Sequence, residues 1–220
     1  MAGVVTALKA QKKNKDRVNV YIDGRFAFGL AAIEAVRLQR GQKLSDDEIA
    51  TLQERDEAHQ AHEAALRSLD YRPRSVDEIR RHLSGKGVEP HVIDEIIRRL
   101  TEAGLLDDRA FVRYWLENRR DFRPRGQRAL RMELRQKGVP QDIIDEVLDE
   151  GHSEDAAAYQ AALAQARKIR TTDPREFRRK LEAQLVRRGF SYDTAREATA
   201  RAWSELYSTN EREFIDESEV

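Results

Sequence analysis

The sequence predicts a mainly α-helical protein, with three tandem three-helix repeats that form a curved helical array behind a small antiparallel β hairpin or meander. Two observations carry this prediction. Glycines recur at equal intervals of 51 residues, at Gly87, Gly138 and Gly189, and a fixed interval of this length indicates helical repeats. Charged residues make up 36% of the chain and aromatic residues only 7%, which suits amphipathic helices better than a β-sandwich.

Residues 1–44 are expected to form the β-rich extension. Apolar residues alternate with others over 18–22, and this period of two is typical of a half-buried strand. Asp23-Gly24 then favours a type I′ turn, because that turn needs positive φ, which Gly and Asp tolerate. The strands of the predicted meander are 4–10, 18–22 and 25–30.

Each predicted repeat has a second helix with two apolar residues four positions apart, on one helical face. These pairs are Ile79 and Leu83, Leu130 and Leu134, and Leu181 and Leu185. The repeating glycine follows each pair, where a helix can end in the left-handed conformation. The expected boundaries are a connecting helix at 45–60, repeats at 61–106, 107–152 and 153–208, and an acidic, disordered tail at 209–220.

The first and second helices of two repeats are joined by the same proline-containing motif. It occupies residues 71–75 (Tyr-Arg-Pro-Arg-Ser) and 122–126 (Phe-Arg-Pro-Arg-Gly), again 51 residues apart. Proline prevents the preceding helix from continuing. The third repeat has a helix start at Asp173 instead. Each repeat is too small to bury its own apolar face, so neighbouring repeats are expected to stack.

The net charge is zero, but the charges are unevenly distributed along the chain. Residues 119–137 contain eight basic and two acidic residues, and residues 141–158 contain seven acidic and no basic residues. A basic patch attracts polyanions or acidic protein faces. The simpler interpretation is a set of solvated helical faces, but clustering of arginine in the middle repeat favours a binding role.

Three arginines of the middle repeat, Arg128, Arg131 and Arg135, are predicted to share one helical face, roughly 110° from the buried leucines. Each of the other two repeats has arginine at only one of the three matching positions, so packing of the repeat does not require the stripe. The candidate partner-binding residues are Arg80, Arg81, Arg120, Arg123, Arg125, Arg128, Arg131, Arg135 and Lys137. The expected structural residues of the repeat are Leu83, Leu134, Leu185, Gly87, Gly138 and Gly189.

Several motifs together resemble the RecX family, the bacterial regulators of the RecA recombinase. One is the run 104–111 (Gly-Leu-Leu-Asp-Asp-Arg-Ala-Phe), leading to Trp115 and Arg119. Another is Leu-x-x-Lys-Gly-Val at 83–88 and 134–139. Residues 11–29 resemble the β-rich extension of some members. The chain departs from the family pattern in the weakly apolar last helix of the third repeat and in its acidic tail.

The resemblance implies a regulator that binds the RecA filament on single-stranded DNA and modulates, by expectation inhibits, its ATP hydrolysis and strand exchange. Such a role belongs to the control of DNA repair and recombination. The basic surface is expected to contact either an acidic recombinase face or DNA phosphate, and both partners stay open. Two alternatives act without a recombinase: a DNA-binding module or a helical-repeat scaffold. Net neutrality and the lack of a regular aromatic platform argue against strong DNA binding by the chain alone.

An enzyme has the least support from the sequence. The chain has no cysteine, no glycine-rich phosphate loop and no nucleophile elbow. His59 and His62 lack a third zinc ligand, and Asp107-Asp108 is expected to cap a helix. We therefore expect no cofactor and no metal. No apolar run reaches membrane-spanning length and no secretion signal is evident, so we expect a cytoplasmic protein without membrane contact. We also expect it to be a monomer.

Overall fold

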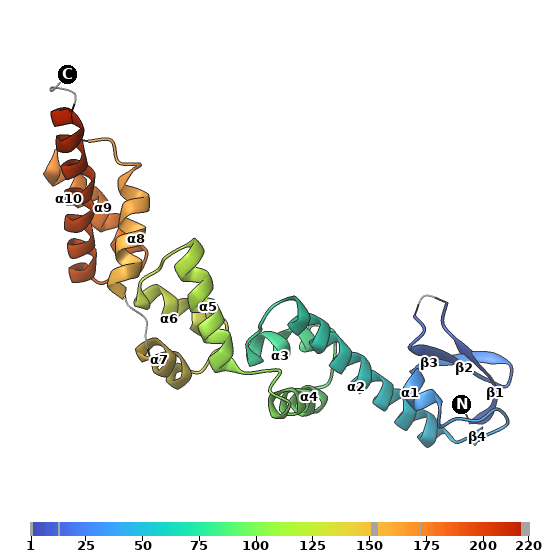
Figure 1. The fold of residues 1–220 in the computed structure, drawn as a ribbon. Helices are drawn as coiled ribbons and strands as arrows, with labels where there is room; N and C mark the ends of the chain where they lie inside the picture. Colours follow the sequence, from blue (N-terminus) through green and yellow to red (C-terminus); the bar gives the residue numbers. More distant parts are fainter. Residues whose placement is uncertain (1, 13, 151–153, 172, 217–220) are drawn as a thin grey trace. The chain divides into compact units, whose positions relative to one another are not determined.

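The computed structural model describes residues 2–12, 14–150, 154–171 and 173–216. Within these residues it contains ten helices and a four-stranded antiparallel sheet, which confirms the predicted fold class (Figure 1). The chain divides into two compact units. One comprises residues 1–74 and 79–106, and the other comprises residues 75–78 and 107–220.

The sheet has the strand order β3-β2-β1-β4. The three predicted strands are present, and a fourth of only two residues pairs with the start of β1. Two residues are too few to give a period in the sequence, so this strand was not predicted. Asp23 and Gly24 have φ of 48° and 81°, as the predicted type I′ turn requires. The strands are β1 Gly3–Ala10, β2 Arg17–Ile22, β3 Arg25–Ala31 and β4 Lys43–Leu44.

One face of the sheet forms a small core with the short helix α1 (Ala32–Ala35) and the start of α2 (Asp46–Tyr71). Asp56 of α2 is buried and joins the helix to the sheet. Its carboxylate accepts hydrogen bonds from both terminal nitrogens of Arg17, at 2.8 and 3.2 Å, and from the backbone N–H of Ala31. The buried charge is therefore paired and fully hydrogen-bonded.

The predicted connecting helix and the first helix of the first repeat are one continuous helix, α2, of 26 residues. Ser45 and Glu48 form a capping box at its start. The remaining helices of the repeats are α3 Val76–Ser84 and α4 Pro90–Glu102; α5 Asp108–Phe122, α6 Gln127–Gln136 and α7 Gln141–Asp149; and α8 Glu154–Ala166, α9 Pro174–Arg187 and α10 Tyr192–Asp216.

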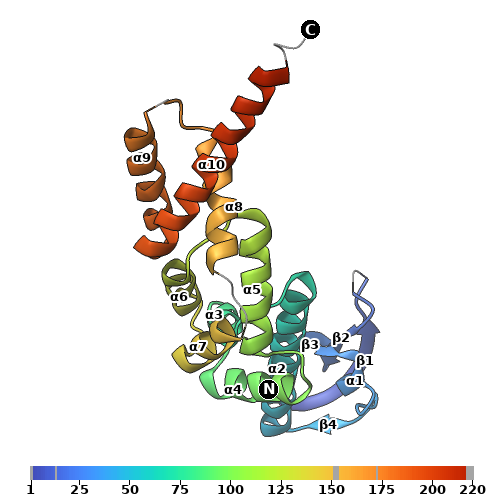
Figure 2. The same cartoon turned by 60° about the vertical axis from the view of Figure 1, so that its left-hand side comes forward.

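The six apolar residues of the predicted helix pairs, Ile79, Leu83, Leu130, Leu134, Leu181 and Leu185, are all fully buried. In the third repeat α10 lies against α8 and α9 (Figure 2). The buried residues of α10 in this core are small alanines. Trp203 supplies the missing apolar volume, with its ring centroid 4.8 Å from that of Phe177. The weakly apolar helix of this repeat is therefore still packed.

Helix α10 extends to Asp216, so residues 209–216, for which the sequence predicts disorder, are helical. Glutamate and arginine in this segment have good helix propensity, which lets a packed helix continue into a charged end. Residues 217–220 of the predicted tail lie outside the described residues.

The joint of each proline motif bonds to the loop that carries the next repeating glycine. Ser75 Oγ donates to the carbonyl of Lys137 at 2.6 Å, and the backbone N–H of Gly126 donates to the carbonyl of Arg188 at 3.1 Å. The two donor residues, Ser75 and Gly126, are 51 residues apart, and so are the two acceptor residues, Lys137 and Arg188. The two bonds are therefore one contact that repeats with the helices. It satisfies polar groups that would otherwise be buried without a partner.

We expect the three repeating glycines to differ in their tolerance of alanine. All three have positive φ, between 75° and 89°, which costs an alanine about 1–2 kcal/mol. A Cβ at Gly87 would meet nothing within 4 Å, whereas at Gly138 it would overlap the side chain of Asp77 and at Gly189 that of Ala129 and its backbone nitrogen. Urea unfolding should give a loss of stability that rises from Gly87→Ala through Gly138→Ala to Gly189→Ala. Equal losses would contradict the close approach.

Candidate partner-binding surface

The predicted stripe lies on α6, to one side of the buried face of that helix. Arg128 and Arg135 are exposed, and Arg131 is half-buried. Arg131 donates from Nε to Asp145 Oδ1 of α7 at 2.9 Å. Hydrogen bonds from Gln141 and then from Arg131 lower the pKa of Asp145. Asp145, from the acidic block that follows the basic segment, thus neutralises Arg131 in the middle of the stripe. Arg128 and Arg135 at its two ends form no ion pair with described residues.

A second basic group surrounds Glu133 on the same helix. Its Oε2 accepts from Trp115 Nε1 at 3.0 Å and from Arg119 Nε at 2.7 Å, and Arg125 Nε lies 3.6 Å from its other oxygen. The guanidinium carbon of Arg119 lies 4.4 Å from the centroid of the Trp115 ring, within the range of a cation–π contact. The single negative charge of Glu133 faces two guanidinium groups, those of Arg119 and Arg125, so this group keeps a net positive charge.

A third group, which we call the joint cluster, consists of Arg123, Arg125 and Arg188. Burial lowers the pKa of Arg188, and the nearby charges of Arg125 and Arg123 lower it further. The three side chains share one neighbourhood because the N–H of Gly126, beside Arg125, bonds to the carbonyl of Arg188. A gathering of like charges is typical of a surface that binds an anion.

Arg188 was not among the predicted binding residues. The available signal was the position of Arg188. A basic residue precedes each repeating glycine, and Arg188 follows Arg123 by the same interval at which Lys137 follows Arg72. Only the fold shows that the joint and the following loop touch.

Within the part of the chain that the structure describes, Arg123, Arg128 and Arg135 make no ion pair. The other candidates of the middle repeat are engaged. Arg120 pairs with its exposed neighbour Asp121 at 3.3 Å, and Lys137 Nζ lies 2.8 Å from Glu78 Oε1. The structure thus separates three unpaired arginines from the larger predicted set.

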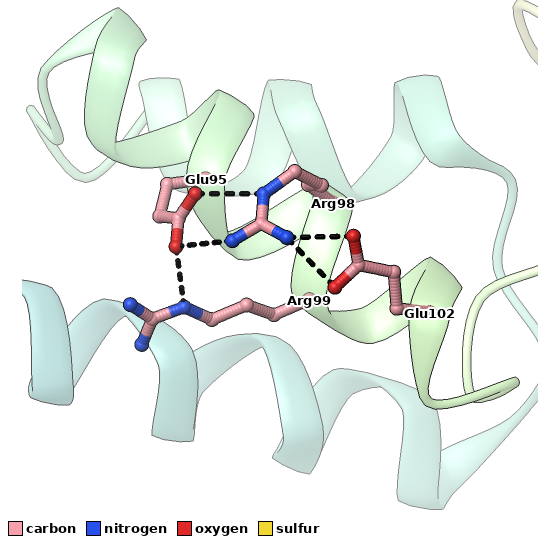
Figure 3. A network of polar contacts seen from close by, with 4 residues as sticks. All are labelled: Glu95, Arg98, Arg99 and Glu102. Atoms are coloured by element: carbon pink, nitrogen blue, oxygen red, sulfur yellow. Dashed lines mark hydrogen bonds and ion pairs between the residues drawn. The ribbon is translucent and has the colours of Figure 1, made fainter.

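In the first repeat the candidate binding residues Arg80 and Arg81 are both engaged within the chain. Arg80 contacts Asp94 at 2.6 Å, and Arg81 also has a contact within the chain. Figure 3 shows a charge network along α4, in which Arg98 binds both Glu95 and Glu102, and Arg99 binds Glu95. Hydrogen bonds from Arg98 and Arg99 lower the pKa of Glu95 to about 2. These arginines have little positive charge left for a partner.

The predicted cap at Asp107-Asp108 serves two helices. Asp107 accepts from the N–H of Arg109 and caps its own helix, α5. Asp108 is buried, and it accepts from the N–H of Val76 at 2.9 Å, at the start of α3. Burial raises the pKa of Asp108, because the charged form loses water. Glu154 makes the corresponding bond to the N–H of Gln127 at 3.0 Å.

Among the described residues, no group of three or more His, Cys, Asp or Glu side chains is placed to hold a metal ion. Over the same described ranges, no helix is both long enough and apolar enough to cross a membrane.

Asp108 affects stability through its hydrogen bond to the start of α3 and through its buried charge. We expect the variants Asp108→Asn and Asp108→Ala to distinguish these two contributions. The raised pKa means that the folded state holds the proton more tightly than the unfolded state. Wild-type stability should therefore fall as pH rises from the unfolded value near 3.8 through the raised value. The asparagine keeps an acceptor without the charge, so its stability relative to wild type should increase between pH 4 and 7. The alanine variant also lacks the acceptor, so it should be about 1 kcal/mol less stable than the asparagine variant at either pH. Thermal unfolding measures both, and a pH-independent difference for asparagine would contradict the assignment.

We expect substitutions of Glu133 to have opposite effects on stability and on polyanion binding. Glu133→Ala leaves Trp115 Nε1 and Arg119 Nε without their acceptor and should cost about 1–3 kcal/mol. Glu133→Gln keeps an acceptor and should cost less. Both remove a negative charge from a basic surface, so the folded variants should elute from a heparin column at higher salt than wild type. Earlier elution would show that this surface does not bind polyanions.

Family models of RecX match the chain in four segments: the regulatory protein RecX N-terminal domain at 3–45, and the first, second and third three-helix domains at 61–100, 107–148 and 153–199. Regulatory protein RecX of Bacillus subtilis (strain 168) is 32% identical over 96% of this chain and 81% of its own length. The protein of the same name from Listeria monocytogenes serovar 1/2a is 29% identical over 96% of this chain and 80% of its own.

Solved structures agree with these matches. A crystal structure of regulatory protein RecX has a TM-score of 0.68 and 27% identity, and the match covers 88% of this chain and 97% of that one. RecX from Lactobacillus salivarius has a TM-score of 0.59 at 22% identity, covering 67% and 97%, and supports the fold alone. The chain belongs to the RecX family of regulatory proteins.

Proposed function

We propose that this protein binds the RecA recombinase filament on single-stranded DNA and restrains its ATP hydrolysis and strand exchange. Membership of a family of regulatory proteins supports a regulatory role. The observation that carries the binding surface is the set of three unpaired arginines of the second repeat, Arg123, Arg128 and Arg135. The protein acts by binding, and the filament supplies the catalysis.

The unpaired arginines suit such a partner on energetic grounds. An arginine already paired with a carboxylate must exchange that contact for a new one, so its net contribution to binding is small. Arg123, Arg128 and Arg135 are exposed and form no ion pair among the described residues, although Arg135 is near enough to Asp145 for its charge to lower the pKa of that carboxyl. Their planar guanidinium groups bind carboxylate or phosphate with two parallel hydrogen bonds.

The same chemistry fits two groups on the filament, a carboxylate-bearing face of the recombinase and a DNA phosphate. Salt dependence separates them. Each phosphate contact on a single strand lowers the logarithm of the affinity by about 0.7 per tenfold increase in salt, through counterion release. Binding to an acidic protein face lacks this counterion-release term, so its affinity should fall less steeply with salt.

We expect the triple variant Arg123→Gln/Arg128→Gln/Arg135→Gln to restrain the recombinase less well than wild type. With three charge-assisted contacts removed, the concentration for half-maximal restraint of ATP hydrolysis should rise by about tenfold or more. The measurement is ATP hydrolysis by the recombinase on single-stranded DNA, titrated from substoichiometric to saturating amounts of this protein.

The matched control is Arg98→Gln/Arg99→Gln, which removes exposed arginines that are neutralised within α4 (Figure 3). This control should restrain the recombinase as wild type does. If the triple variant is folded and restrains normally, the surface assignment is wrong. If wild type leaves ATP hydrolysis and strand exchange unchanged at every concentration, the proposed function itself is wrong.

A further inference from the structure

The N-terminal sheet has an aromatic pair on the face opposite its core. Tyr21 and Phe26 are directly paired across β2 and β3, with ring centroids 6.1 Å apart and planes at 77°. The Nζ atom of Lys9 lies 5.0 Å from the centroid of the Tyr21 ring. Phe26 is 59% exposed, although it is a large apolar side chain.

Two β-bulges produce this face. Val20 pairs with Phe28 and Tyr21 pairs with Phe26, so Ala27 is an extra residue in β3. Phe26 and Phe28 are two positions apart and would share one face of a regular strand, but the bulge turns Phe26 outward while Phe28 stays buried. In β1, Thr6 is an extra residue in the same way. Bulges often re-aim side chains next to functional sites.

The sheet region is also strongly basic. Residues 1–45 contain nine Lys or Arg and three Asp or Glu, a net charge of +6 in a chain whose total is zero. Lys9 contacts the Tyr21 ring and Arg25 precedes Phe26, whereas Lys12 and Lys15 lie in the β1–β2 turn at the other end of β2. All four are exposed and make no ion pair with described residues. Of the acidic residues, Asp23 accepts from the N–H of Val4, Glu34 is half-buried beside arginines, and Asp16 is exposed.

We propose that this face, which we call the sheet platform, binds single-stranded nucleic acid, with bases stacked on Phe26 and Tyr21 and phosphates held by Lys9, Arg25 and the lysines of the β1–β2 turn. Every base has a π face, so aromatic stacking accepts any sequence. The bases of a duplex are already stacked on each other, which leaves single strands as the ligand. Charge complementarity selects a polyanion over an apolar peptide, because the apolar area is only two rings on a region of net charge +6.

The platform is separate from the three unpaired arginines of the second repeat and lies in a different unit of the chain. It goes beyond the proposed function, since direct binding of a single strand needs no recombinase. The test contains no recombinase, so its outcome is independent of whether the protein restrains a filament.

The experiment is fluorescence anisotropy of a labelled thymidine oligonucleotide, titrated with the full chain at low salt. Phe26→Leu keeps apolar volume but removes the π face, and it should weaken binding by about fivefold or more. Phe26→Trp keeps the π face and should bind at least as tightly as wild type. The control is Tyr71→Leu, an aromatic residue that is 84% exposed on α2, and it should bind as wild type.

Wild-type protein gives a second measurement that depends on no variant. An abasic oligonucleotide of the same length keeps the phosphates but has no bases, so it should bind more weakly than the thymidine oligonucleotide by a similar factor. A uridine oligonucleotide distinguishes RNA from DNA as the natural strand.

Two outcomes overturn the platform. If Phe26→Leu binds as wild type, or if the abasic strand binds equally well, the attraction is electrostatic only. If Phe26→Leu keeps its affinity for DNA and, in a separate assay with the recombinase added, no longer binds it, the face is a protein-docking surface.

Discussion

One repeated contact carries the organisation of the helical repeats: the hydrogen bond from each proline joint to the loop of the next repeating glycine. At Gly126 the joint backbone lies so close to Gly189 and Phe190 that a Cβ would not fit. At the equivalent position of the first repeat, Ser75 makes the bond with its hydroxyl instead. A three-helix repeat of this size has too little apolar surface to be stable alone, so the contact between neighbours is part of the stability of each.

The same contact also arranges the charges. Because the joint bonds to the loop, the arginines of the joint and the basic residue of the loop come together as the joint cluster. In the first repeat Arg74, which is in register with Arg125, lies near His82 instead, and the pKa of His82 is lowered by burial and then by the charges of Lys86 and Arg74. Elsewhere the chain neutralises its arginines, with Asp94, Asp145 and the glutamates of α4. The unpaired cations of the second repeat are therefore what remains after local pairing.

Most of the fold could be predicted from the sequence, because helix periods, proline joints and glycines at equal intervals are local signals. The candidate surface could be predicted only in part. The stripe on α6 follows from helix geometry. Two of its contacts depend on which helices meet and could not be predicted: the ion pair of Arg131 with Asp145, and the hydrogen bonds that Glu133 accepts from α5. Strand β4 is too short to leave a pattern. The bulge at Ala27 breaks the two-residue alternation, so the sequence alone places Phe26 and Phe28 on the same face, and the sheet platform was not predicted.

The continuity of α2 has a mechanical consequence. A single helix of 26 residues, about 39 Å long at 1.5 Å per residue, leads from the sheet to the helices of the first repeat. No glycine or proline interrupts it, and Asp56 clamps the sheet to its side. The direction in which the sheet faces is thus set by a residue count: each residue added to this spacer would rotate one end by about 100° about the helix axis. A longer or shorter helix would therefore keep this direction only if its length changed in steps close to whole turns.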